Sequence, residues 1–231
     1  MFELSPEQWT AVALSVRVAV VATLFSLPFG IAIAWVLARK NFWGKTLLIA
    51  TIYLPMVMPP VVVGYLLLLS FGRKGFIGAW LADNLGIVFS FRWTGAALAS
   101  GIMAFPLMVG AIRLSIEAVD RKFEDAAATL GANPLWTFAT VTLPLALPGV
   151  IAGAILCFAR ALGEFGATIT FVSNIPGETQ TIAAAIYSLT HVPGGDAQAL
   201  KLVVVSIALS MLALVLAEWF GRRAGARRHG A

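Results

Sequence analysis

The chain has 231 residues, of which 60% are hydrophobic and 12% charged, with a mean hydropathy of +0.91 and a net charge of +5. Globular domains carry about 25% charged residues, so this composition excludes a water-soluble enzyme, a disordered tail and a secreted disulfide scaffold. The single cysteine, Cys157, allows no internal disulfide and offers no metal-binding cluster. The basic residues lie between long apolar runs, which indicates membrane topology rather than nucleic-acid binding.

Five apolar runs are long enough for a helix to cross the bilayer core, which takes about 20 residues. In chain order they cover residues 9–38, 46–71, 93–112, 140–172 and 197–220. None shows the alternation of a membrane β-barrel strand, so we expect an all-α polytopic bundle of five transmembrane helices. The first run is long for one crossing, which leaves open a strong tilt, an interfacial start, or two helices and therefore six spans. No basic segment precedes this run, so we expect no cleaved signal peptide.

The distribution of Lys and Arg among the connections predicts the orientation of the chain. One set of connections, together with the C-terminal tail, carries most of them: Arg39, Lys40, Lys45, Arg113, Arg121, Lys122, Arg222, Arg223, Arg227 and Arg228. The opposite set carries Arg73, Lys74 and Arg92, with Lys201 at its edge. Because cytoplasmic connections are enriched in basic residues, we expect the N-terminus outside and a basic cytoplasmic tail over residues 221–231.

Residues 114–139 form the longest predicted cytoplasmic connection. Asp120 can cap a helix that begins at Arg121, and Glu124 and Asp125 follow near the positive end of its dipole. A small apolar stripe, a glycine stop and a second helix start follow: Phe123, Ala126 or Ala127, Leu130, Gly131, Asn133 and Pro134. On physical grounds this segment either docks in a groove of another protein or lies at the lipid headgroups.

The same segment resembles the EAA motif of ABC importer permeases, in which a Glu and two Ala precede a Gly and then Ile-x-Leu-Pro. The matching residues are Asp125, Ala126, Ala127, Gly131, Val141, Leu143 and Pro144. Asp125 replaces the usual Glu, although Glu124 precedes it, so either acidic residue can make the charged contact. The resemblance implies a coupling helix that sits in a cleft of a separate ATPase subunit, with Glu124 added to the coupling residues. The chain has no phosphate-binding G-x-x-x-x-G-K-[ST] loop of its own, and we expect no catalytic residues, cofactor or metal.

Further segments are similar to the molybdate branch of this family. Residues 54–65 and 72–78 resemble the second span and its following loop in molybdate permeases, and residues 159–168 resemble a span shared with sulfate permeases. Residues 171–181 discriminate better and resemble the molybdate branch. The resemblance implies one transmembrane domain over residues 9–220 in a bacterial inner membrane. The expected partners are a second permease copy, two ATPase subunits, an extracytoplasmic oxyanion-binding protein and membrane lipid, with no nucleic acid. Sulfate, thiosulfate or tungstate are the alternative substrates.

Charged residues inside the fourth run are candidates for the translocation path or its gate. Arg160 and Glu164 are four residues apart and therefore on one face of a continuous helix, where they either neutralise each other or meet the anion and hold the gate. Four polar residues follow, which either face the path or bond between helices: Thr168, Thr170, Ser173 and Asn174. Met56 and Met58 lie among Pro55, Pro59 and Pro60, where the backbone must break beside protein or water.

Two other classes of function fit the sequence less well. A stand-alone secondary anion transporter often carries internal repeats, and a membrane enzyme needs a nucleophile and a base, but neither pattern is visible in the sequence. We expect residues 173–197 to form a polar outer loop that faces the binding protein, with His191 as a solvated residue rather than a metal ligand.

Overall fold

The computed structural model describes residues 3–226, without the side chains of residues 217 and 220–226. Part of the predicted basic tail, residues 227–231, lies outside the described residues. Over residues 3–226 the ordered elements are all helices, which confirms the expected all-α membrane fold. Four helical stretches are long and apolar enough to cross a membrane: Pro6–Arg39, Trp93–Glu117, Pro134–Leu162 and Asp196–Leu216.

A fifth span is possible only as a broken one. Helices α2 (Lys45–Val57) and α3 (Pro60–Phe71) are bent by 112° with respect to each other at Met58 and Pro59. Pro59 and Pro60 have no backbone N–H to continue a helix, so the break follows directly from the sequence. The predicted number of five spans holds if this pair counts as one.

Helix α1 (Pro6–Arg39) is a single helix of 34 residues. Ser5 starts it with a capping box: its hydroxyl accepts the Gln8 N–H, and the Gln8 side chain accepts the Ser5 N–H. Pro28 lies inside the helix without ending it. The alternative in which residues 9–38 form two helices, with six spans in total, is therefore wrong.

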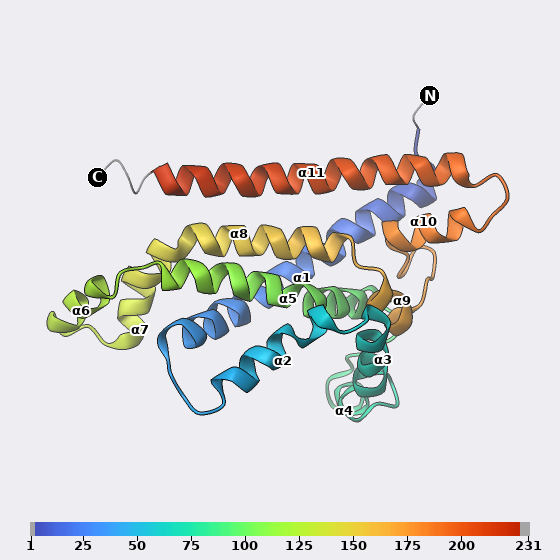
Figure 1. Cartoon of the computed structure of the whole chain (residues 1–231). Helices are drawn as coiled ribbons and strands as arrows, with labels where there is room; N and C mark the ends of the chain where they lie inside the picture. Colours follow the sequence, from blue (N-terminus) through green and yellow to red (C-terminus); the bar gives the residue numbers. More distant parts are fainter. Residues whose placement is uncertain (1–2, 227–231) are drawn as a thin grey trace.

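Helix α5 (Trp93–Glu117) is the centre of the bundle and packs most extensively against α8 (Leu143–Leu162) and α1. Helix α11 (Asp196–Ala226) lies along α8 on the outside of this group (Figure 1). Many α5 residues that face the neighbouring helices are small, which lets helix backbones approach closely. They include Gly95, Ala96, Ala97, Ala99, Ser100, Gly101 and Ala104.

The fourth predicted span, residues 140–172, is not one helix. Helix α8 ends at Leu162, and a short α9 (Gly166–Val172) begins after a turn whose residue Phe165 has non-helical φ −134° and ψ −53°. Helix α9 instead packs closely against α3: a Cβ on Gly64 would lie 2.5 Å from the Ala167 carbonyl oxygen. The prediction of a continuous helix is wrong because apolar character persists through a backbone break.

Two helices lie in segments that the sequence suggested were loops. Helix α4 (Phe76–Leu85) follows α3, and α10 (Ile182–Thr190) lies within the expected outer loop 173–197. Helix α10 is held by packing on α11 and by the Ile182 N–H, which donates to the Ser15 hydroxyl of α1 at 2.7 Å. The remaining short elements, α6 (Arg121–Thr129), α7 (Pro134–Thr137) and the π-helix η1 (Phe138–Thr142), lead into α8.

Candidate functional sites

The segment α6–α7 has the helix boundaries that its sequence predicts. The Asp120 carboxylate accepts the Lys122 N–H at 3.0 Å, so α6 begins at Arg121 as expected. Gly131 has φ +84°, and the Ala132 N–H donates to the Ala127 carbonyl at 3.1 Å, which closes α6 in a Schellman turn. The Asn133 side chain then accepts the Trp136 N–H at 2.8 Å and starts α7. Both predicted caps and the predicted glycine stop are confirmed.

Large apolar side chains of this segment are exposed. Leu130 is 88% and Trp136 is 63% exposed, and Phe123 and Leu135 are exposed beside them. No residue of α6, Arg121–Thr129, is buried. In Figure 1 this segment protrudes at the end of the bundle where α5 ends, opposite the N-terminal end of α1. We call α6 and α7 together, residues 121–137, the docking segment.

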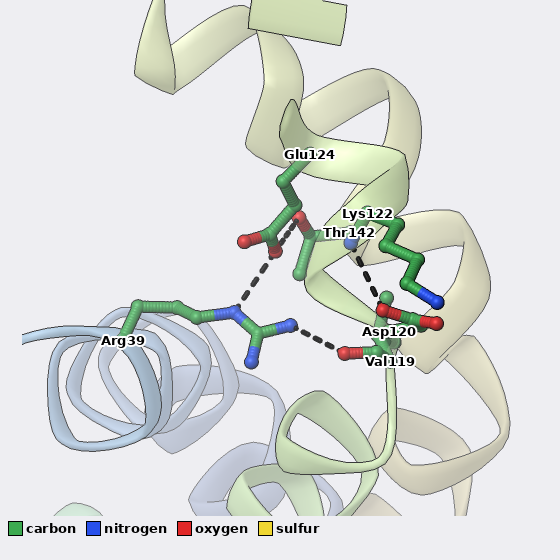
Figure 2. Close-up of polar contacts among 6 residues, drawn as sticks. All are labelled: Arg39, Val119, Asp120, Lys122, Glu124 and Thr142. Atoms are coloured by element: carbon green, nitrogen blue, oxygen red, sulfur yellow. Dashed lines mark hydrogen bonds and ion pairs between the residues drawn. The ribbon is translucent and has the colours of Figure 1, made fainter. Parts of the chain in front are cut away.

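One of the two acidic residues at the start of α6 accepts hydrogen bonds from other side chains of the same chain (Figure 2). The Arg39 Nε of α1 donates to the Glu124 Oε1 at 2.9 Å, and the Thr142 hydroxyl donates to the same oxygen at 2.6 Å. Asp125, in contrast, is exposed. The sequence leaves open which of these two acidic residues makes a charged contact with a partner. Glu124 is already paired with side chains of its own chain.

The other coupling residues are divided between surface and core. Ala126 is exposed and Ala127 partly buried on α6. Leu143 packs against the main core at the start of α8, whereas Pro144 is exposed in the first turn of that helix. A contact of these residues with an ATPase stays a prediction.

Arg160 and Glu164 form an ion pair, but not along one helix. Arg160 lies in the last turn of α8 and Glu164 in the turn after it, with Arg160 Nη1 2.7 Å from Glu164 Oε2. The second carboxylate oxygen accepts the Ala167 N–H at 2.9 Å and so caps α9. The Glu164 side chain is 1% exposed and that of Arg160 is 34% exposed. The predicted common helix face is wrong, and the two residues instead join the two sides of the break.

Three of the four polar candidates after this pair donate hydrogen bonds within the fold. The Thr168 hydroxyl donates to the Phe165 carbonyl at 2.9 Å, and the Thr170 hydroxyl to the Gly166 carbonyl at 2.8 Å, so both bond locally within α9 and its first turn rather than between helices. Asn174 donates through Nδ2 to the Ser188 hydroxyl at 2.6 Å.

The other candidates for lining the translocation path differ in their exposure. Ser173 is exposed, with φ +66°. Met56 is 57% exposed, whereas Met58 is partly buried against the core between α3 and α9. The two backbone breaks meet here, because a Cβ on Gly166 would lie 2.8 Å from the Pro60 Cβ.

Two residues of the α6 network were not identified as functional from the sequence. The sequence presents Arg39 only as a charge that sets topology, and Thr142 stands at the variable position x of the Ile-x-Leu-Pro pattern. Arg39 is 85 residues from Glu124 in the chain, so no local pattern links them. His191 is exposed as expected, with Nδ1 2.7 Å from the Tyr187 carbonyl oxygen. Residues 3–226 hold no group of three or more potential metal ligands.

Comparison with known proteins identifies the family. A family described as "binding-protein-dependent transport system inner membrane component" matches residues 26–225. The molybdenum transport system permease protein ModB of Escherichia coli (strain K12) is 59% identical over 219 residues, which cover 95% of this chain and 96% of the relative. ModB of Haemophilus influenzae is 56% identical and covers 93% of each chain. The sulfate transport system permease protein CysT of Escherichia coli (strain K12) is 35% identical, covering 95% of this chain and 80% of the relative.

Solved structures agree on the fold. The MetNI methionine ABC transporter in inward-facing conformations gives a TM-score of 0.73 at 14% identity, covering 96% of this chain and 99% of that chain. A bacterial alginate ABC transporter in complex with a periplasmic protein gives a TM-score of 0.73 at 17% identity, covering 95% and 80%. This chain belongs to the binding-protein-dependent transport system inner membrane components, the multi-pass, non-catalytic membrane subunits of ABC importers whose ATPase is a separate subunit.

Proposed function

We propose that this chain is the permease of a molybdate importer. The observation that carries the substrate is its 59% and 56% identity to two molybdenum permeases across nearly the whole chain, against 35% to the sulfate permease. Family membership also argues against a stand-alone secondary transporter, because its members depend on a binding protein.

The docking segment is proposed to receive the ATPase. Four large apolar side chains are exposed on it, at the end of the bundle where α5 ends. Exposed apolar residues on a short, well-capped helix fit a groove on a partner better than they fit solvent. Asp125 is exposed on this surface and is the acidic residue available for a basic partner group.

The proposed assembly contains two copies of this chain, two ATPase subunits and one binding protein. The expected orientation places the N-terminus outside and the C-terminal tail in the cytoplasm. Two features support it: the excess of Lys and Arg on one side, and the position of the docking segment opposite the N-terminal end of α1. Twofold assembly is the commonest arrangement for soluble oligomers, and here it would bring two broken helix pairs to one path.

The translocation path is proposed to pass the break between α8 and α9. Broken backbone at membrane depth needs protein or water around it, and the α2–α3 break adjoins it. The partly exposed guanidinium of Arg160 offers donors to a divalent oxyanion, while Glu164 prevents that anion from being held tightly. Ser173, Asn174, Met56 and Met58 stay candidates for lining this path.

The test is uptake in proteoliposomes that contain this chain with its ATPase and binding protein. Labelled molybdate should accumulate only with internal ATP, and unlabelled molybdate should compete much better than sulfate. Equal competition by sulfate would contradict the proposed substrate. Uptake driven by an ion gradient without ATP would contradict the importer itself.

A further inference from the structure

Glu124 lies on the docking segment, but its hydrogen-bond donors come from two other elements. Arg39 belongs to the last turn of α1 and Thr142 to the end of η1 (Figure 2). The Arg39 side chain is 8% exposed and that of Glu124 is 20% exposed, so this ion pair is largely shielded from solvent. Shielding and a second, charge-assisted bond from Thr142 favour a fixed geometry over the fluctuating pairing of surface charges.

The Arg39 guanidinium also holds the chain just before α6. Its Nη2 donates to the Val119 carbonyl at 3.0 Å, while Nε donates to Glu124. One planar group therefore binds both the turn that leads from α5 into the docking segment, at Val119, and helix α6, at Glu124. A lysine presents a single ammonium group and cannot reproduce this two-point geometry.

The packing of α6 on its neighbours does not provide a comparable link to α1. Helix α6 packs mainly against α7 and η1, and η1 continues directly into α8. Between α6 and the end of α1 lies a cavity of about 280 Å³, which Arg39, Lys40 and Glu124 help to line. The docking segment is thus joined to α8 through the chain itself and to α1 through the side chain of Arg39. The adjoining η1 contacts α1 through the rings of Phe138 and Trp35, whose centroids are 5.3 Å apart.

We propose that Arg39 is a positioning residue that makes α1 move with the docking segment when the ATPase displaces it. This inference rests on the proposed docking of the ATPase. A displacement of α6 reaches α8 through η1, and the Arg39–Glu124–Thr142 network transmits it to α1, which packs along α5 and α8. Without the guanidinium, the docking segment can shift relative to the end of α1, while α1 keeps its packing on α8.

The experiment compares Arg39→Gln, Arg39→Lys and Thr142→Val with the unmodified chain in proteoliposomes containing the ATPase and binding protein. Arg113→Gln is the matched control, because Arg113 forms a 2.7 Å ion pair with Glu117 within one helix, α5. The readouts are co-purification of the ATPase and molybdate uptake per ATP hydrolysed. In Arg39→Gln we expect the ATPase to remain bound and uptake per ATP to fall about fivefold or more, the lower range of coupling between distant sites.

Arg39→Lys should keep only part of the uptake per ATP hydrolysed of the unmodified chain, and Thr142→Val should lower this ratio less than Arg39→Gln does. Arg113→Gln should match the unmodified chain. An unchanged ratio in Arg39→Gln would overturn the proposal. Loss of ATPase binding in that variant alone would also overturn it, because Arg39 would then shape the docking surface instead of transmitting its motion. Failure of the unmodified chain to bind any ATPase would instead contradict the proposed function.

Discussion

At the scale of single residues, Glu164 has two structural roles. Its carboxylate pairs with Arg160 across the break and accepts the Ala167 N–H that starts α9. A buried acid with both oxygens engaged is costly to disturb, because removal of one partner leaves an uncompensated charge. The ion pair and the Ala167 N–H bond therefore stabilise the break from both sides.

Glu164→Gln should destabilise the protein by about 2 kcal/mol, below the value for a fully buried pair because the Arg160 guanidinium remains partly hydrated. The amide oxygen can still cap α9, so this change removes the charge and spares the cap. Thermal unfolding in detergent measures the difference.

The double variant Arg160→Met/Glu164→Gln leaves no unpaired charge and should recover most of this stability. Its uptake then distinguishes the two interpretations of the pair. Full molybdate uptake would mean that the ion pair only neutralises itself, and loss of uptake with recovered stability would support a role in the path.

At the scale of elements, the turn between α6 and α7 depends on Gly131. Gly131→Pro should uncouple ATP hydrolysis from uptake while the protein still inserts in the membrane. Proline cannot adopt φ +84°, and it removes the N–H that donates to the Ala128 carbonyl at 2.9 Å. Uptake per ATP hydrolysed and the amount of protein in the membrane are measured together. Gly131→Asn tolerates the left-handed backbone and should keep most of the uptake; an equal loss in both variants would refute this explanation.

The contact between α3 and α9 depends on Gly64. Gly64→Ala should lower the free energy of unfolding by about 1–3 kcal/mol, the usual cost of overpacking, because the added methyl group meets the Ala167 carbonyl oxygen. Gly163→Ala is the control, since a Cβ there has no heavy atom within 4 Å. Denaturation of both variants in one detergent provides the comparison, and equal midpoints would show that α3 and α9 separate at little cost.

What the sequence predicts well is local, and what it misses is long-range. Asp120, Gly131 and Asn133 bond within a few residues, so their patterns predict the docking segment almost residue by residue. Hydropathy likewise locates the long spans. The same apolar signal runs through Gly163 without change, so hydropathy cannot detect a break that depends on the hydrogen bonds of Glu164. The Arg39–Glu124 pair depends on the packing of the complete bundle.

At the scale of the whole molecule, the two ends of the bundle should face different compartments. Cys157 is fully buried, so the unmodified chain should react little with an impermeant maleimide. Asn84→Cys on α4 should be labelled in spheroplasts, and Thr129→Cys on α6 only in inverted vesicles, because both positions are exposed and the predicted orientation places α4 outside and α6 in the cytoplasm. Labelling of both variants from one side would contradict the predicted orientation.

The π-helix η1 sets the angular register between the docking segment and the bundle. A π turn holds about one residue more than the 3.6 residues of an α turn. An ordinary α-helix over the same five residues, Phe138–Thr142, would rotate everything before it by roughly a quarter turn about the α8 axis. Deletion of one of these residues would restore an α turn and leave that direction almost unchanged. The π turn therefore absorbs one residue without turning the exposed apolar side chains of the docking segment away.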